Sequence, residues 1–309
     1  MPANPPPLAT EDEVRRYFET CSNWGRWGPD DNAGTINLIT PEKRREAAAT
    51  VRSGRAVSLA FPWNTVGGPG NNNPAQHYLR AWRDACVDYI GISYHGYATT
   101  HIDALCHIFW EGQGWNGRPA TEVTSLGARF GSVDAWSNGI TTRGVLIDIP
   151  RFRGLPFVPA GDPVRGWEIE AAAERQGVEL RSGDALIVYS GRAAFFAANP
   201  GNVPGVPPTA GLHADVCPVL KRHDVALLGW DQLDASPSGY NLFDNPPRAG
   251  GPVHVFAIVY MGLPLLDNAR LEPLAEACAE EGRYEFLLTV NPLHVRGGTG
   301  SPVNPIAVF

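Results

Sequence analysis

The stretch YATTHIDALCHIFWEGQGWNG, residues Tyr97–Gly117, sets three polar side chains inside an otherwise apolar run. They are the imidazoles of His101 and His107 and the carboxylate of Asp103. Imidazole and carboxylate together suit a borderline divalent ion such as Zn²⁺ or Mn²⁺. The alternative is that the three groups merely pack as buried polar side chains, and their clustering alone leaves the two interpretations evenly weighted.

The residues that lead into and through this cluster, 87–105, are rich in β-branched and aromatic side chains, which predicts a strand. Side chains two residues apart on a strand share a face. We therefore expect His95 and Tyr97 on the face that carries His101 and Asp103. After the strand the chain must turn, and the second imidazole of the cluster could then return to the same pocket.

Around this segment, apolar strand patterns interleave with helical patterns, without a break in composition and without an internal repeat. Strands are predicted at residues 56–63, 144–150, 184–191, 226–231, 252–268 and 284–293, and helices at 11–21, 41–54, 166–178, 211–225 and 271–282. This pattern predicts one α/β domain over residues 11–309, preceded by a flexible N-terminal arm at residues 1–10. Neither a dinucleotide-binding glycine motif after a strand nor a GxSxG nucleophile elbow occurs in the sequence.

Composition narrows the class of protein. The 309 residues carry a formal net charge of -7, which argues against nucleic acid as a partner. The five cysteines show no CxxC pairing, which is typical of a reducing compartment. The sequence shows no secretory signal pattern and no run of apolar residues long enough for a membrane span. We therefore expect a cytoplasmic bacterial protein that acts on a small molecule.

The segment THIDALCH resembles the motif His-x-Gly-Thr-His-x-Asp-x-Pro-x-His of the metal-dependent cyclase family, which includes bacterial kynurenine formamidase and isatin hydrolase. Thr100, His101, Asp103 and His107 match that motif. Further stretches are similar to the longer-chain members of the family. They are WGPDDNAGTINLITPEK near the start, FWEGQGWNG after the motif, PVH and GLPLLDN around residues 252–268, and EGRYEFLLTVNPLHVRGGTGSPVNPIAVF at the end.

The resemblance implies a compact α/β fold of the swivelling β/β/α type, with a mixed, barrel-like sheet and flanking helices. It also implies a homodimer or homotetramer. The ion is expected to be zinc or manganese, one per site, with a second ion as the alternative. The resemblance assigns His101, Asp103, His107, His254 and Asp267 to the metal, and strand parity adds His95 as a candidate substitute ligand. The residues that the resemblance assigns to catalysis are His107 and His254.

Three departures from the family motif concern the ligands. Tyr97 stands where the family has its first histidine, so either His95 takes over as a ligand or Tyr97 only lines the pocket. Thr99 and Leu105 replace the glycine and the proline of the motif. In the second ligand segment, Asp267 stands where the family usually has glutamate, which favours a single ion.

Several other side chains could contribute to the site. Phe109, Trp110 and Trp115 follow the motif and could wall an aromatic substrate, or could simply fill the core. His77 follows an asparagine-rich loop and could reach a neighbouring pocket. Asp231 ends an apolar strand and could orient a ligand histidine from behind, or cap the strand end.

Three functions remain open from the sequence. The first is a hydrolase that uses a metal-activated water on an amide, formamide, lactam or lactone. The second is a cyclase or dehydratase that uses the ion as a Lewis acid. The third is a metal-binding protein without catalysis.

Overall fold

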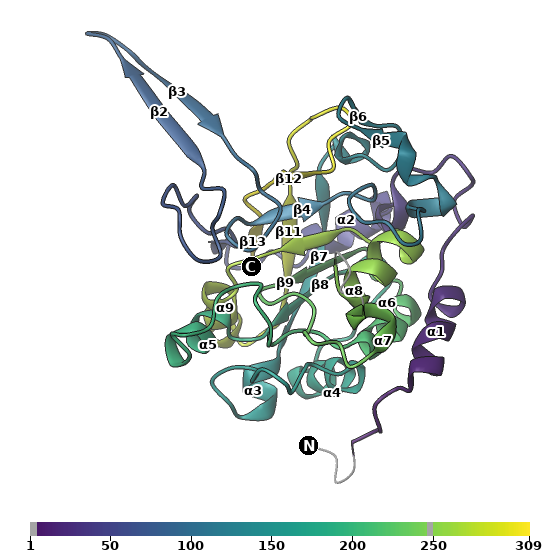
Figure 1. The fold of residues 1–309 in the computed structure, drawn as a ribbon. Helices are drawn as coiled ribbons and strands as arrows, with labels where there is room; N and C mark the ends of the chain where they lie inside the picture. The colour runs from purple at the N-terminus through teal and green to yellow at the C-terminus, as the bar shows by residue number, and fades with distance from the viewer. Residues whose placement is uncertain (1–4, 246–249) are drawn as a thin grey trace.

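The computed structural model describes residues 5–245 and 250–309, and its central feature is a strongly curled nine-stranded sheet (Figure 1). Its strands in spatial order are β1 (Ala56–Ser58), β13 (Ile306–Val308), β11 (Glu285–Val290), β7 (Ile140–Asp148), β8 (Ala185–Tyr189), β9 (Leu227–Trp230), β10 (Leu265–Asp267), β4 (His101–Asp103) and β12 (Gly300–Pro302). Strands β7 to β10 run parallel, and the remaining pairs are antiparallel. The expected mixed, barrel-like α/β fold is confirmed.

Helices cover both faces of this sheet (Figure 1). They are α1 (Glu11–Thr20), α2 (Pro41–Ala48), α3 (Ile149–Arg153), α4 (Gly166–Gln176), α5 (Arg192–Ala198), α6 (Cys217–Arg222), α7 (Asn241–Asp244), α8 (Pro252–His254) and α9 (Glu272–Glu281). One core contains residues of α4 and α6, and the other contains residues of α9. No helix among the described residues has the length and apolarity needed to cross a bilayer.

The parallel strands are buried on both faces, which explains their nearly continuous apolar sequences. On β7, Val145 and Ile147 pack into the first core, whereas Leu146 between them packs into the second. On β8, Val188 packs into the first core and Ile187 packs into the second. The strand predictions are confirmed over residues 144–148 and 185–189, where a strand covered on both faces needs mostly apolar side chains, whereas Ile149 and Pro150 begin α3.

The predicted strand at residues 252–268 is wrong over its first part. Residues 252–254 form α8, a π-helix follows at Val255–Met261, and only Leu265–Asp267 form the strand β10. Almost every side chain of this helical segment is buried, so no polar face marks a helical period in the sequence. A helix that is buried all round and rich in β-branched residues has the sequence pattern of a buried strand.

The predicted strand at residues 87–105 is interrupted. Strand β3 (Cys86–Gly91) pairs with β2 (Gln76–Ala81) in a hairpin that projects from the body of the molecule (Figure 1). Residues 92–100 then form an irregular loop before β4. Gly96 in this loop has a φ of 128°, a conformation that other residues rarely adopt, and the extended run breaks there.

The expected flexible arm at residues 1–10 falls partly outside the described residues, because residues 1–4 are not described. In the described part, the Pro7 carbonyl accepts a hydrogen bond from Arg165 at 3.0 Å. The Thr10 side chain caps α1 in a capping box with Glu13. A small second hairpin, β5 (Val123–Thr124) with β6 (Gly127–Ala128), lies on the surface.

Candidate metal centre

The register of two neighbouring strands brings the two candidate ligand segments together. Strand β10 pairs antiparallel with β4, and Asp267 lies directly opposite His101. Side chains at directly opposite positions are close neighbours on one face. Asp103, two residues after His101, points to that same face, so three polar groups from two distant parts of the sequence converge.

His101 is held with one defined nitrogen toward the site. It is almost fully buried, and its Nδ1 donates a hydrogen bond to the Thr99 carbonyl oxygen at 2.8 Å. This bond leaves Nε2 facing the two carboxylates, 3.3 Å from Asp103 Oδ1 and 3.9 Å from Asp267 Oδ2. A ring nitrogen fixed by a backbone carbonyl is the usual arrangement of a metal-binding histidine.

Asp103 lies at the centre of the cluster, fully buried, and neither carboxylate oxygen has a hydrogen-bond partner in the described chain. Imidazole nitrogens lie around it. His95 Nδ1 is 2.9 Å and His101 Nε2 3.3 Å from Oδ1, and the Nε2 atoms of His107 and His254 are each 3.8 Å from Oδ2. The contact between His95 Nδ1 and Asp103 Oδ1 is short, but it does not count as a hydrogen bond. His95 Nδ1 therefore also has no hydrogen-bond partner in the described chain.

His95 and His107 reach the cluster from loops. Their rings stack with centroids 3.8 Å apart and an interplanar angle of 2°. His95 Nε2 contacts Thr299 Oγ1 at 3.1 Å, which directs Nδ1 toward Asp103. Gly300 provides the space, because a Cβ there would come within 2.9 Å of His95 Cε1. His95 therefore joins the site through a turn and not through the predicted strand alternation.

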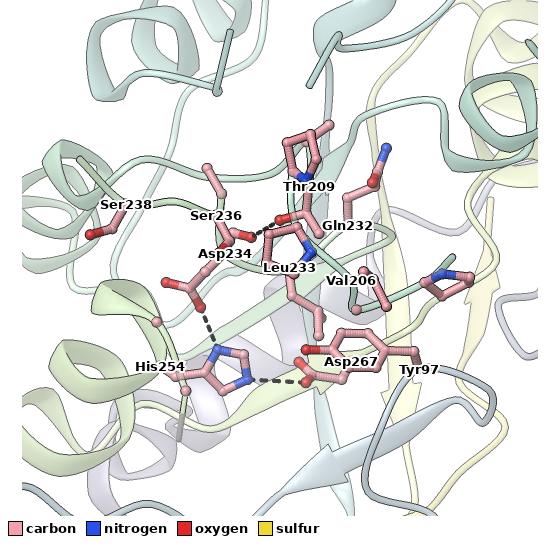
Figure 2. Close-up of a pocket in the computed structure, with 18 of the residues that line it drawn as sticks. Tyr97, Val206, Thr209, Gln232, Leu233, Asp234, Ser236, Ser238, His254 and Asp267 are labelled. Atoms are coloured by element: carbon pink, nitrogen blue, oxygen red, sulfur yellow. Dashed lines mark hydrogen bonds and ion pairs between the residues drawn. The ribbon is translucent and has the colours of Figure 1, made fainter. Parts of the chain in front are cut away.

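His254 approaches from the end of α8 and lies between two carboxylates (Figure 2). Its Nδ1 contacts Asp234 Oδ2 at 2.5 Å, and its Nε2 lies 3.2 Å from Asp267 Oδ2. The other oxygen of Asp267 accepts a hydrogen bond from Trp230 Nε1. Asp234 is itself fixed by the Val253 amide at 2.6 Å. The carboxylate–imidazole–carboxylate line fixes the ring in one orientation.

Neighbouring groups of the cluster have pKa values shifted in different directions. Burial alone would raise the pKa of the Asp103 carboxyl, but the surrounding imidazoles, His107 first, outweigh it and hold that pKa well below its usual value. Burial lowers the pKa of His107 to about 4. Burial also acts to lower the pKa of His254, but Asp267 and Asp234 outweigh it and raise that pKa well above its usual value.

Two sets of donor atoms could each hold an ion, and they share Asp103. One set is His95, His101 and Asp103, and the other is Asp103, His254 and Asp267; within each set the atoms lie within 4.8 Å of one another. Imidazole nitrogen and carboxylate oxygen match the preferences of Zn²⁺ and Mn²⁺. A buried carboxylate without hydrogen bonds is costly unless a cation compensates it, so these residues fit a divalent metal.

The site opens into a cavity of about 650 Å³, a volume typical of small-molecule sites. Tyr97 lies at its wall beside Asp267 (Figure 2). The Tyr97 ring packs on Gly205, where a Cβ would come within 2.1 Å of the ring. Gly205 belongs to the proline-rich segment 203–208, which forms one side of the cavity.

Four predicted pocket residues do not line this cavity. Trp115 is fully buried, and its Nε1 donates to the Asp31 carbonyl at 3.1 Å. Trp110 packs among aromatic rings of the core, and Phe109 packs against the second core. His77 lies on the β2–β3 hairpin, with its Nε2 2.5 Å from Asp88 Oδ1. For the three aromatic residues the core-filling interpretation holds, because large rings next to a site also bury the most surface.

The carboxylate behind the ligands is Asp234 and not Asp231. The oxygens of Asp231 accept the backbone N–H groups of Ser190 and Arg192 at 2.8 and 2.9 Å, so this residue fixes the start of α5. Burial raises the pKa of Asp231 to about 7. The sequence offers only one hint of Asp234, its place just after a buried strand in the run GWDQLD.

Two further residues that the sequence analysis missed, Asn268 and Arg192, tie the loop at residues 92–100 to β10. Asn268, next to Asp267, donates through Nδ2 to the carbonyl oxygens of Gly96 and Thr99. Arg192 Nη2 donates to the Tyr97 carbonyl at 2.6 Å, and its Nη1 donates to Asn268 Oδ1 at 2.6 Å. The loop that carries His95 is therefore anchored to β10 through these side-chain hydrogen bonds.

Asp234→Asn is expected to lower the affinity for the metal by roughly 10–100-fold, the usual effect of losing the partner that orients a ligand imidazole. The measurement is a competition titration against a chelator. The matched control is Asp244→Asn, because Asp244 lines the same cavity but bonds to the backbone amides of Ser238 and Gly239. An affinity of Asp234→Asn within twofold of the unsubstituted protein would show that Asp234 does not support the site.

The comparisons with known proteins agree with this fold. The family model described as "Putative cyclase" matches residues 35–237. A crystal structure described as a novel cyclase is 28% identical, covers 93% of this chain and 99% of its own, and superposes with a TM-score of 0.78. No curated protein matches the chain.

Two isatin hydrolases share the fold. Isatin hydrolase A from Labrenzia aggregata is 18% identical over 84% of this chain and 94% of its own, with a TM-score of 0.58. Isatin hydrolase A from Ralstonia solanacearum is 17% identical over 82% of this chain and 92% of its own, with a TM-score of 0.53. At these identities the likeness concerns the fold alone. Because the family model spans more than half of the 309 residues, the chain belongs to the cyclase family.

Proposed function

We propose that this protein is a metal-dependent hydrolase that cleaves an amide, formamide, lactam or lactone bond in a small cyclic or aromatic substrate. The observation that carries the proposal is the carboxylate of Asp103, which is buried without hydrogen bonds among imidazole nitrogens at the floor of a cavity. Such a group is costly to bury in a site that serves only packing. Two proteins with the same fold are named as hydrolases, which is compatible with the proposed hydrolysis.

The ion is proposed to be Zn²⁺ or Mn²⁺, held by His101, Asp103 and His95, with Asp267 on the facing strand. When bound there, such an ion supplies a water molecule of lowered pKa and polarises a carbonyl oxygen. Because the two donor sets overlap at Asp103, we expect one ion per chain. A measured ratio of two ions per chain would mean that both ions bind the Asp103 carboxylate.

His107 and His254 are proposed to move protons. His107 lines the cavity, and its lowered pKa of about 4 keeps it neutral at pH 7, so its Nε2 can accept a proton. His254, whose pKa Asp267 and Asp234 raise, carries a proton that can pass to the leaving group. In the alternative arrangement with a second ion, His254 is a ligand and gives up that proton on binding.

Hydrolysis is tested with the purified protein, reconstituted with Zn²⁺ or Mn²⁺ and assayed against a panel of cyclic amides, aryl formamides and lactones. The expected result is metal-dependent opening of at least one class, with one oxygen atom from ¹⁸O-labelled water in the product. Turnover without the label would identify the cyclase or dehydratase alternative. Bound metal with no turnover across the panel would favour a binding protein without catalysis.

Metal affinity is expected to rise with pH between pH 6 and 8. Burial acts to lower the pKa of His101, but its contacts with Asp103 outweigh burial and raise it above its usual value, so below that pKa a proton competes with the metal. Each proton released on binding increases the affinity about tenfold per pH unit. Chelator competition at pH 6, 7 and 8 measures the slope, and an affinity that stays constant over this range would contradict the assignment of His101 as a ligand.

A further inference from the structure

Arg192 places a positive charge in the wall of the cavity that opens from the metal centre. In the described part of the chain its guanidinium forms no ion pair, and each hydrogen bond that it donates goes to a neutral oxygen. Buried arginines elsewhere in the fold are paired with carboxylates, as Arg143 is with Asp184 and Arg153 is with Glu168. Arg192 therefore faces the cavity as a cation whose counter-ion the described residues do not supply.

The guanidinium of Arg192 is held in place by these hydrogen bonds. Its Nη1 donates to the Asp231 carbonyl oxygen at 3.0 Å and to Asn268 Oδ1 at 2.6 Å, and its Nη2 donates to the Tyr97 carbonyl oxygen at 2.6 Å. A guanidinium has five N–H groups, so one on Nε and one on Nη2 remain for a ligand. Because the side chain is already ordered, binding an anion costs little further conformational entropy.

Two carboxylates lie near Arg192, and both accept hydrogen bonds from backbone amides. Asp231 accepts the N–H groups of Ser190 and Arg192, and Glu272 Oε1 accepts the N–H of Ala193 at 2.9 Å. Burial lowers the pKa of the Arg192 guanidinium, although Asp231 and Glu272 act to raise it. The positive charge is thus only partly compensated by the protein, and an anion in the cavity would compensate it further.

The surroundings of this charge are largely apolar. The Arg192 Cζ atom lies 5.8 Å from the ring centre of Phe61 and 5.6 Å from that of Phe196. Apolar residues also make up much of the cavity wall, and they include Phe195, Val203, Pro204, Pro207 and Pro208. A charge-assisted hydrogen bond is stronger in such surroundings than in water, and the apolar wall suits an aromatic or cyclic body.

We propose that Arg192 binds a carboxylate group of the substrate, which is then a small aromatic or cyclic carbonyl compound with one carboxylate. This inference rests on the proposed function, since it names the class of substrate that the same cavity accepts. The two oxygens of a carboxylate can accept the N–H groups that remain on Nε and Nη2. One guanidinium balances one negative charge, which favours a carboxylate over a phosphate group with a charge close to -2.

The contacts of Arg192 place this carboxylate close to the metal centre. Asn268, which accepts a hydrogen bond from Nη1, directly follows the candidate ligand Asp267. Tyr97, whose carbonyl oxygen accepts a hydrogen bond from Nη2, lies beside Asp267 at the cavity wall (Figure 2). A small substrate can therefore reach both places, with its carboxylate at Arg192 and its reactive carbonyl group at the ion.

The binding test compares benzoate with nitrobenzene, which has the same shape but no charge. Dissociation constants are measured by ligand-detected NMR on the full-length protein, both metal-free and loaded with Zn²⁺. We expect benzoate to bind the metal-free protein, and Arg192→Gln to weaken this binding roughly 10-fold or more, as the loss of a charge-assisted hydrogen bond implies. The affinity for nitrobenzene should change by less than about twofold, and Arg192→Lys should keep part of the affinity for benzoate.

Two control variants separate the charge of Arg192 from its role in anchoring the loop. Asn268→Ala removes the same anchor but keeps the charge, so it should affect benzoate and nitrobenzene alike. Arg175→Gln removes an arginine that packs 5.1 Å from the Phe152 ring centre outside the cavity, and it should change neither constant. Equal losses for the two ligands in Arg192→Gln, or no loss for benzoate, would overturn the proposal. Benzoate binding that requires Zn²⁺ would overturn it too and assign the carboxylate to the ion.

Turnover provides a second readout that separates this inference from the proposed hydrolysis. For a panel substrate that carries a carboxylate, Arg192→Gln should raise KM roughly 10-fold or more, and it should leave KM for the uncharged nitro analogue nearly unchanged. Benzoate binding that depends on Arg192, without turnover across the panel, would support the anion site and contradict the hydrolysis. Turnover that is equally fast for the acid and its nitro analogue would support the hydrolysis and contradict the anion site.

Discussion

Asp103→Ala is expected to remove metal binding and catalysis together. The side chain belongs to both donor sets, and neither of its oxygens has a hydrogen-bond partner in the described chain. Loss of a residue behind a ligand lowers metal affinity by roughly 10–100-fold, and loss of a shared ligand must exceed that range. The measurements are the bound metal per chain after equilibration with a stoichiometric amount of Zn²⁺ or Mn²⁺, and the rate on whichever substrate the panel identifies.

The control for this substitution is a partly buried aspartate that is also paired with a histidine. Asp215 Oδ1 lies 3.1 Å from His213 Nδ1, but this pair lies outside the cavity and its carboxylate also bonds to Arg165. Asp215→Ala should reduce the free energy of unfolding and leave the metal content unchanged. If Asp103→Ala keeps its metal and its rate while folded by circular dichroism, the proposed site is wrong.

Arg143→Ala is expected to have the largest effect on stability. Arg143 is fully buried, and its guanidinium donates to both oxygens of Asp184 at 3.0 and 2.6 Å and to Glu285 at 2.6 Å. Lys43 Nζ also contacts Asp184, which is itself fully buried. Removal of one partner from a buried ion pair leaves a poorly compensated charge, which costs about 3–5 kcal/mol of unfolding free energy.

Urea denaturation of the metal-free protein measures this loss. Arg15→Ala is the matched control, because Arg15 pairs with Glu11 at 2.7 Å on an exposed helix surface. Exposed pairs of this kind contribute less than about 1 kcal/mol. Equal losses in the two variants would mean that the buried network around Arg143 is not a major source of stability.

The sequence predicted the strand and the shared face of His101 and Asp103, because the determinants of both are local. His101 and Asp103 lie on a short strand with their side chains on one face, as the alternation requires. The same alternation did not extend back to His95, since the backbone turns at Gly96. Strand parity pointed to His95 and a resemblance of motif pointed to His254, but neither could show how these two side chains reach the cluster.

Long-range contacts explain what the sequence could not predict. His254 ends a short helix whose buried continuation has the sequence pattern of a strand, and only the packed fold distinguishes the two. Asp234 contacts His254 across twenty residues of chain, and no local pattern separates its role from that of Asp231. The same holds for Trp110, whose place in the core depends on the aromatic residues of distant helices.

The most direct measurement is an anomalous difference map from a crystal of the protein grown with Zn²⁺ or Mn²⁺. The account predicts a peak about 2.0–2.2 Å from His101 Nε2 and from a carboxylate oxygen of Asp103. A peak at a place remote from both side chains, or a fully ordered site without any peak at saturating metal, would contradict it.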